Sequence, residues 1–117
     1  MQITIYHNPK CAKSRATLKL LEERGFEPVI IEYLKTPPSK SELAGLVKLL
    51  GIKPRELLRT KEPEYKQAGL ANPKLSDSAI LQAMIKHPKL IERPIVVAGK
   101  KKAALGRPPE NVLRILK

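Results

Sequence analysis

The chain has very little cysteine and few aromatic residues. Its 117 residues include one cysteine, no tryptophan and one phenylalanine. A single cysteine cannot form an internal disulfide and cannot build a four-cysteine zinc site, which excludes disulfide-stapled secreted domains and structural zinc centres of that kind. We therefore expect a protein of a reducing compartment, and the cytoplasm as its location.

Long hydrophobic runs are also missing. No stretch approaches the roughly 18–20 apolar residues of a membrane span, and residues 1–7 lack the basic start of a signal peptide, so we expect no membrane association. Hydrophobic residues make up 42% of the chain and charged residues 29%, which is ordinary for a folded protein. The length lies within the roughly 100–150 residues of one domain, so we expect a single domain over residues 1–117.

Acidic residues are scarce beside basic ones. There are 23 lysines and arginines against 11 acidic residues, a formal net charge of +12. Such an excess can serve nucleic acid, an anionic membrane, a small oxyanion or solubility alone. Few aromatic rings are available for base stacking and no recognition motif is present, so we expect no nucleic-acid partner. The run Lys100–Lys102 is interpreted as a solvated hairpin tip.

The N-terminal third has the pattern of a strand, a helix and a second strand. Alternating β-branched residues predict a strand over Ile3–Tyr6, and apolar residues near helical spacing predict a helix from about Lys13 to Arg24. Gly25 supplies the left-handed stop of that helix. The short apolar run Val29–Ile31 is typical of a buried strand, and a Thr-Pro-Pro breaker follows it.

The middle of the chain is predicted to be helical. Ser39 and the glutamate three residues later form a capping-box pattern that starts a helix ending at Gly51. Further helical segments are expected at Pro54–Leu58, at Pro63–Gln67 and from a Ser76 cap to His87-Pro88. The chain then predicts a hairpin of Ile95–Val97 with Ala103–Leu105 and a last helix over Pro109–Leu116. This order indicates an α/β, thioredoxin-like (glutaredoxin-like) fold with a mixed sheet and a helical insertion at about residues 37–88.

Cys11 lies between the first predicted strand and the first predicted helix. The free N–H groups at a helix N-terminus lower a thiol pKa and stabilise the nucleophilic thiolate. Lys10, Lys13 and Arg15 add positive potential nearby. His7 lies four residues upstream, where it is either a structural hydrogen-bonding group or a base that modulates Cys11.

Ser14 stands where dithiol oxidoreductases carry their second cysteine, so an external thiol has to complete any redox cycle. Three arginines occupy unusual contexts: Arg59 follows an apolar pair, Arg93 precedes Pro94, and Arg107 precedes two prolines. The planar guanidinium suits tetrahedral oxyanions better than an ammonium does. Together these residues suggest a thiolate that faces an oxyanion.

The segment Ile3–Leu18, ITIYHNPKCAKSRATL, closely resembles the N-terminus of glutaredoxin-linked arsenate reductases, the ArsC family, in its short form. The likeness continues through Glu32–Ser39, Leu57–Arg59 and His87–Val97. It implies a thioredoxin-like fold with a helical insertion. It also implies an active site of Cys11 with Arg59, Arg93 and Arg107, supported by His7, Ser14 and Arg15, and it makes Pro94 the counterpart of the cis-proline of such folds.

The resemblance further implies a reaction, the reduction of arsenate in arsenic detoxification. The Cys11 thiolate attacks arsenate held by the arginines, glutathione reduces the adduct, and glutaredoxin removes the glutathione to release arsenite. Glutathione is then a co-substrate and glutaredoxin a protein partner, with no metal or bound organic cofactor. Two alternatives remain: a glutathione-dependent thiol reductase of this fold with another substrate, and an Spx-like regulator that binds RNA polymerase. Regulators of that type typically carry Cys-x-x-Cys, against which Ser14 argues.

Overall fold

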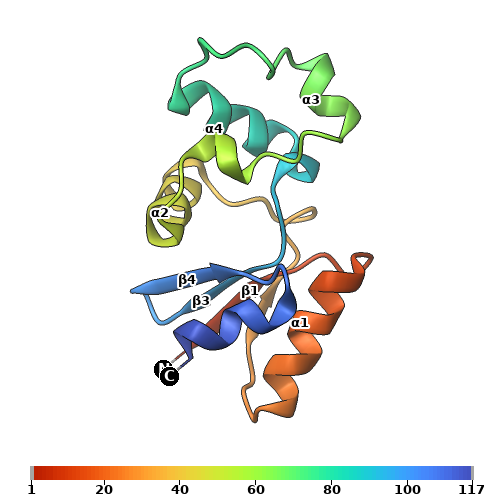
Figure 1. The fold of residues 1–117 in the computed structure, drawn as a ribbon, viewed down its shortest axis with the longest axis vertical. Helices are drawn as coiled ribbons and strands as arrows, with labels where there is room; N and C mark the ends of the chain where they lie inside the picture. The colour runs from red at the N-terminus through yellow and green to blue at the C-terminus, as the bar shows by residue number, and fades with distance from the viewer. Residues whose placement is uncertain (1, 117) are drawn as a thin grey trace. The chain divides into compact units, whose positions relative to one another are not determined.

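The computed structural model describes residues 2–116, which form two compact units. One unit extends to Thr36 and resumes at Arg93, and we call it the sheet unit. The other is Pro37–Glu92, and we call it the helical unit. The helices and strands of both units are labelled in Figure 1.

The sheet unit is built on a mixed four-stranded sheet. Its strands are β1 (Ile3–Tyr6), β2 (Val29–Ile31), β3 (Ile95–Ala98) and β4 (Lys102–Leu105), in the spatial order β2-β1-β3-β4 (Figure 1). β1 pairs parallel with β2 and antiparallel with β3, and β3 pairs antiparallel with β4. The parallel pair requires a crossover, which helix α1 (Ala12–Glu23) provides.

One buried apolar cluster of this unit lies on one face of the sheet. Side chains alternate between the two faces of a strand, so Ile3 and Ile5 of β1 lie on the same face as Val96 and Ala98, with which the strand register brings them together. α1 and the 3₁₀ helix η3 (Pro109–Ile115) contribute apolar residues to the same buried cluster. Its buried members are Ile3, Ile5, Leu21, Val96, Ala98, Ala104, Val112 and Ile115.

The buried face of α1 includes two polar residues. Ser14, Thr17 and Leu21 are its buried residues, whereas the apolar Ala16 is exposed. Ser14 and Thr17 can occupy the buried face because their hydroxyl groups have hydrogen-bond partners there. The helix ends as predicted, with Gly25 at φ 84°.

Two details of the sheet unit differ from the sequence predictions. The run Val29–Ile31 does form a strand, but it is not buried: Val29 is 42% and Ile30 is 46% exposed. β2 has only β1 as a neighbour within the described sheet, so this apolar run occupies an edge. The segment predicted as a helix over 109–116 is a 3₁₀ helix over Pro109–Ile115. The hairpin tip at Lys100 and Lys101 is exposed, as expected.

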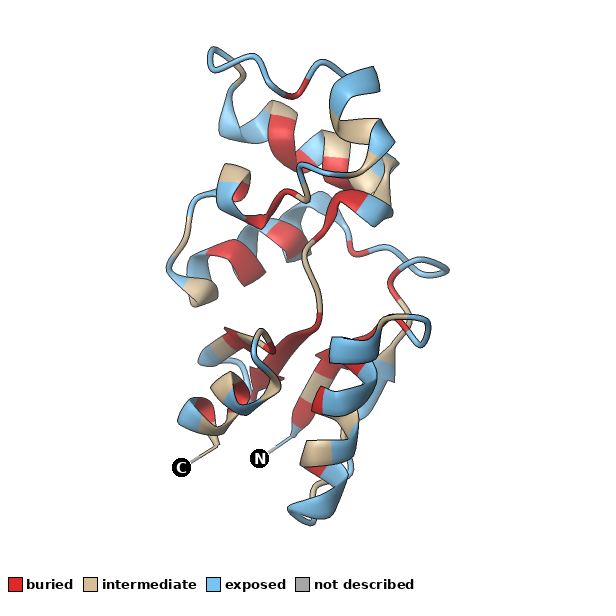
Figure 2. Ribbon diagram, turned by 45° about the vertical axis from the view of Figure 1, so that its right-hand side comes forward, coloured by how far each residue is buried: buried red, intermediate tan, exposed pale blue. Residues whose placement is uncertain are grey.

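The helical unit contains α2 (Lys40–Leu50), η1 (Pro54–Leu57), α3 (Pro63–Gln67), α4 (Asp77–Lys86) and η2 (Pro88–Leu90). Figure 2 shows buried residues along one side of several of these helices. The buried apolar residues of α2 and α4 are Leu43, Leu46, Val47, Ile80, Leu81 and Met84. Within residues 2–116, no helix is both long enough and apolar enough to cross a membrane.

Serine caps start the two longer helices of this unit, as the sequence predicted. The Ser39 Oγ accepts a hydrogen bond from the Glu42 N–H at 3.0 Å, and the Ser76 Oγ accepts one from the Ala79 N–H at 3.1 Å. Gly51 ends α2 with φ 70°, a left-handed conformation that glycine adopts without strain.

Replacing Ser39 with alanine removes the acceptor for the Glu42 N–H and should lower the free energy of unfolding by about 1 kcal/mol. Ser41→Ala is the matched control, because Ser41 is an exposed serine inside the same helix and is expected to change stability by less than about 0.5 kcal/mol. Urea unfolding followed by circular dichroism measures both. Equal effects of the two substitutions would show that the cap does not stabilise α2.

Candidate active site

Cys11 is the N-cap residue of α1. Its backbone is extended, with φ −95° and ψ 124°, and the helix starts at the next residue. The Cys11 N–H donates to the Asn8 carbonyl at 3.0 Å, and the Cys11 carbonyl accepts from the Arg15 N–H at 3.0 Å. The half-buried thiol therefore lies at the positive end of the helix, where the sequence predicted it.

The environment of Cys11 favours the thiolate. Partial burial by itself raises the pKa of the Cys11 thiol, but several groups outweigh it and the net pKa is lowered. The backbone N–H of Ser14, a hydrogen bond and the positive charge from Arg93, and the backbone N–H of Lys13 all stabilise the negative sulfur. The guanidinium that acts on the thiol thus comes from a segment far along the chain.

A buried polar cluster is formed by His7, Asn8 and Ser14, from the segments before and after Cys11. His7 Nδ1 and Ser14 Oγ are 2.7 Å apart, and the Asn8 N–H donates to the same Ser14 Oγ at 3.0 Å. Burial lowers the pKa of His7; the charge of Glu32 raises it and that of Arg15 lowers it, and the net pKa is lowered. His7 is therefore neutral near pH 7. The Ser14 hydroxyl links the His7 ring to the Asn8 backbone, where the loop to Cys11 begins.

Two more side chains fix the loop that leads to Cys11. The Asn8 Oδ1 accepts a hydrogen bond from the Lys10 N–H at 3.0 Å, and Arg15 Nη1 donates to the Pro9 carbonyl at 3.0 Å. The sequence reasoning missed Asn8. A usable signal was present, because asparagine side chains commonly accept hydrogen bonds from the backbone two residues on.

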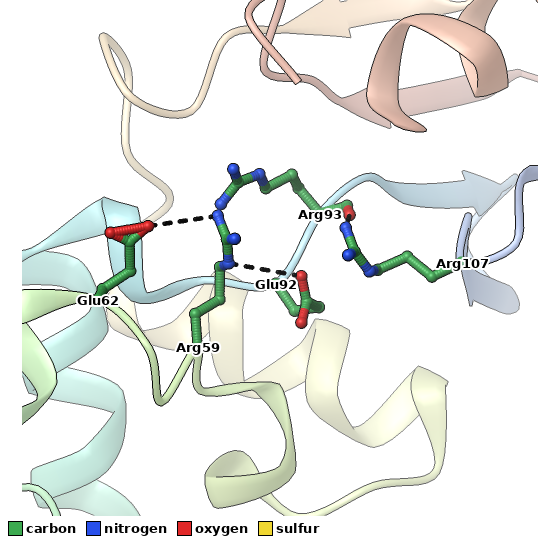
Figure 3. A network of polar contacts seen from close by, with 5 residues as sticks. All are labelled: Arg59, Glu62, Glu92, Arg93 and Arg107. Carbon is green, nitrogen blue, oxygen red and sulfur yellow. Dashed lines mark hydrogen bonds and ion pairs between the residues drawn. The ribbon is translucent and has the colours of Figure 1, made fainter. Parts of the chain in front are cut away.

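Arg93 and Arg107 flank the same end of the β3–β4 hairpin. Arg93 lies two residues before β3 and Arg107 two residues after β4, and the register pairs Ile95 with Leu105. Arg107 Nη1 donates to the Arg93 carbonyl at 3.1 Å (Figure 3). The Arg93–Pro94 peptide bond is cis, as the resemblance implied, and Arg107–Pro108 is cis as well.

Arg59 belongs to the helical unit and takes part in two ion pairs there. Its Nη1 is 3.5 Å from Glu62 Oε1 and its Nε is 3.7 Å from Glu92 Oε1 (Figure 3). The Arg59 N–H donates to the Leu90 carbonyl at 2.8 Å, which ties its backbone to the segment leading to Glu92. Within the sheet unit the structure brings together Cys11, Arg93 and Arg107. The two glutamates beside Arg59 were not predicted.

Comparison with known proteins decides the family. The ArsC family model matches residues 6–115. The chain belongs to the ArsC family. An arsenate reductase of Neisseria meningitidis serogroup A is 50% identical over 116 residues, which is 98% of each protein. The Escherichia coli K12 protein YfgD, described as uncharacterized, is 54% identical over 116 residues, which is 98% of this chain and 97% of YfgD.

A solved structure shows the same fold. The chain is similar to an arsenate reductase from Vibrio cholerae with a TM-score of 0.95 and 53% identity, covering 98% of each chain. The predicted thioredoxin-like α/β fold is therefore confirmed. In this ArsC member the fold has the four-stranded mixed sheet described above, and the peptide bond before Pro94 is cis.

The lowered pKa of Cys11 predicts that its alkylation by iodoacetamide reaches half its maximal rate at a lower pH than that of an unperturbed cysteine in a short peptide measured alongside. Arg93→Gln removes a hydrogen bond and a positive charge from the thiolate, so the midpoint should move to higher pH. Lys101→Ala, on the exposed hairpin tip, is the control and should leave it unchanged. An Arg93→Gln midpoint equal to that of the wild type would contradict the role of the guanidinium.

The Ser14 side chain should affect the free energy of unfolding and leave the pKa of the Cys11 thiol nearly unchanged. Ser14→Ala removes the partner of both His7 Nδ1 and the Asn8 N–H, and we expect a loss of about 2 kcal/mol in the free energy of unfolding. The backbone N–H of residue 14 remains, so the alkylation midpoint of Cys11 should stay low. Urea unfolding and alkylation against pH measure the two effects. A stability loss no larger than that of Ser41→Ala would show that the buried cluster contributes little.

Proposed function

We propose that this ArsC protein reduces arsenate to arsenite with Cys11 as the nucleophile. The observation that carries the proposal is the half-buried Cys11 thiol, whose pKa is lowered by helix N–H groups and by Arg93. A thiolate beside a guanidinium suits an electrophile that is itself an anion. The identity of about 50% to an arsenate reductase over nearly the whole chain supports arsenate as that anion.

In the first step the Cys11 thiolate attacks arsenic. The Sγ–As bond forms as an As–O bond breaks, and the departing oxygen takes up protons and leaves as water. Arg93 and Arg107 would bind the remaining oxygens and balance their charge, since guanidinium groups bind tetrahedral oxyanions through paired N–H groups. The bond from Arg107 to the Arg93 carbonyl supports a joint role, because it fixes one arginine relative to the other.

Arg59 is proposed as a third oxyanion ligand because it matches the family's third arginine. Its ion pairs with Glu62 and Glu92 would hold the guanidinium in one orientation, at low entropic cost when the anion binds. Glu92 immediately precedes Arg93 in the chain. The dipeptide Glu92–Arg93 would therefore orient Arg59 through the Glu92 carboxylate and also supply the Arg93 guanidinium.

The reduction itself needs two electrons, which two thiols supply when they end as one disulfide. Cys11 is the only cysteine, so the disulfide that leaves must form outside this chain. We propose glutathione as the co-substrate and glutaredoxin as the partner. In total, arsenate and the two thiols give arsenite, water and a glutathione–glutaredoxin mixed disulfide, with Cys11 returned as a thiolate. The cytoplasm, a reducing compartment, supplies both thiols.

Arsenite formation tests the proposal directly. The wild-type protein, mixed with arsenate, glutathione and glutaredoxin, should produce arsenite, and Cys11→Ser should fall to the rate without protein because the nucleophile is lost. Arg93→Lys keeps the charge but loses the planar donor pair, so kcat/KM should fall at least about tenfold. Lys101→Ala is the control and should match the wild type.

Three outcomes would contradict this proposal or a part of it. Wild-type arsenite production no faster than that of Cys11→Ser would exclude arsenate reduction through the thiol. If glutathione and glutaredoxin instead turn over a glutathionylated disulfide through Cys11 while arsenate is not consumed, the protein is a thiol reductase of the same fold with another substrate. Equal rates for Arg93→Lys and Lys101→Ala would show that the guanidinium is not used locally.

A further inference from the structure

Arg59 carries a buried donor beside a carboxylate. Its Nη1 is buried and has no hydrogen-bond partner among residues 2–116. The Glu62 Oε1 lies 3.5 Å from it, which is an ion-pair distance and longer than the roughly 2.7–3.2 Å of an N–H···O hydrogen bond. Buried donors nearly always have an acceptor, so the N–H groups of Nη1 are available to a ligand oxygen.

The backbone that carries this pair is fixed within the helical unit. The Arg59 N–H donates to the Leu90 carbonyl at 2.8 Å, and the preceding residue, Leu58, forms an isolated antiparallel bridge with Ile91. The Glu62 N–H donates to the Arg59 carbonyl at 3.4 Å and closes the turn between them. Both side chains therefore start from one short, hydrogen-bonded turn.

The Glu62 carboxylate is not used by its own helix. Glu62 is the N-cap residue of α3, a position where a side-chain oxygen often accepts a hydrogen bond from the first helical turn, but its side chain makes no such bond. The carboxylate lies beside Arg59 instead (Figure 3), and the Arg59 and Glu62 side chains are only 22% and 25% exposed. An ionised carboxylate accepts hydrogen bonds at several positions and donates none, so Glu62 can accept from a ligand.

A donor and an acceptor this close together define the chemistry of the ligand. An oxyanion that accepts from Arg59 Nη1 brings one of its oxygens next to the Glu62 carboxylate. A bare negative oxygen is repelled there, whereas a hydroxyl oxygen donates a short, charge-assisted hydrogen bond to the carboxylate. The pair therefore fits a tetrahedral oxyanion that keeps a proton. Arsenate and phosphate keep at least one proton near neutral pH, and sulfate has none.

We propose that Glu62 is a specificity-determining residue, whose carboxylate accepts a hydrogen bond from the hydroxyl of an oxyanion held on Arg59 Nη1. The site then selects arsenate and phosphate over sulfate, which has the same tetrahedral shape but lacks the proton. A site that binds a substrate hydroxyl rejects the analogue without it, because its polar groups are left unpaired. The inference deepens the proposed function and rests on it, since it takes Arg59 as a ligand of the substrate anion.

Glu92 offers the matched control for Glu62. Its Oε1 is 3.7 Å from Arg59 Nε, so it pairs with the same guanidinium through a different nitrogen. If both glutamates only orient Arg59, Glu62→Gln and Glu92→Gln should act alike on every anion. If Glu62 accepts from the ligand, only Glu62→Gln should change the preference among anions. Glutamine keeps the size of the side chain, removes the charge and adds an amide donor that can serve an oxygen without a proton.

Anion binding to the full-length wild type, Glu62→Gln and Glu92→Gln is measured by titration calorimetry, with circular dichroism to check each fold. The probes are inorganic phosphate, sulfate and monofluorophosphate, in mildly alkaline buffer where phosphate is mainly the hydrogen phosphate dianion. All three anions then carry the same charge and a similar shape, and only phosphate has a hydroxyl. Thiols do not reduce phosphate, so the titration reports on binding alone. Arsenite formation by the wild type is measured separately.

The wild type should bind phosphate at least about tenfold more tightly than sulfate or monofluorophosphate, because only phosphate can donate to Glu62. Glu62→Gln should bring the three affinities to within about threefold of one another, chiefly by tighter binding of the two anions without a hydroxyl. Glu92→Gln should change all three affinities by a common factor and keep the preference.

The proposal is overturned if the wild type binds sulfate or monofluorophosphate as tightly as phosphate, or binds none of the three. It is equally overturned if Glu62→Gln keeps the preference, or if Glu92→Gln loses it to the same extent. Should Glu62→Gln fail to fold, Glu62→Ala replaces it with the same expected loss of preference. A wild type that shows the preference but forms no arsenite refutes the proposed reaction and leaves the anion selection standing.

Discussion

The thiol of Cys11 is half-buried and yet has a lowered pKa, and the candidate site depends on how these two properties are reconciled. Burial opposes the thiolate, because it withdraws water from the sulfur. Two kinds of group outweigh it: the backbone N–H groups of Lys13 and Ser14 at the start of α1, and the guanidinium of Arg93. The first kind is local in sequence and the second is not. Correct packing of α1 and the β3–β4 hairpin is therefore a condition for the lowered pKa of this thiol.

Buried polar groups hold the thiol loop in place. The hydroxyl of Ser14 is shared by His7 Nδ1 and the Asn8 N–H, so a position that holds a second cysteine in dithiol enzymes here holds the loop together. A buried hydrogen-bonded cluster of this kind favours one conformation, because an alternative would leave its buried groups without these partners. Neutral His7 contributes a hydrogen-bonding group to this cluster and no charge that would act on Cys11.

Much of the fold could be predicted from the sequence. The first strand, α1, the serine-capped helices and the hairpin all follow from local periodicity, caps and glycine stops, which act over a few residues. Burial was harder to predict. The apolar run Val29–Ile31 occupies a sheet edge, and the polar pair Ser14 and Thr17 occupies the inner face of α1. Which strand has two neighbours, and which hydroxyl finds a partner, depends on residues distant in the chain.

The sequence by itself determined the chemistry available to this ArsC protein: one cysteine ahead of a helix, no internal partner for it, and arginines in three separate segments. Only the tertiary structure decided how these parts combine. It set Arg93 beside the thiol, joined Arg107 to the Arg93 backbone, and paired Arg59 with two glutamates. The reason is physical, since hydrogen bonds, charge and steric contact act over a few ångströms in space, and only folding brings distant segments that close.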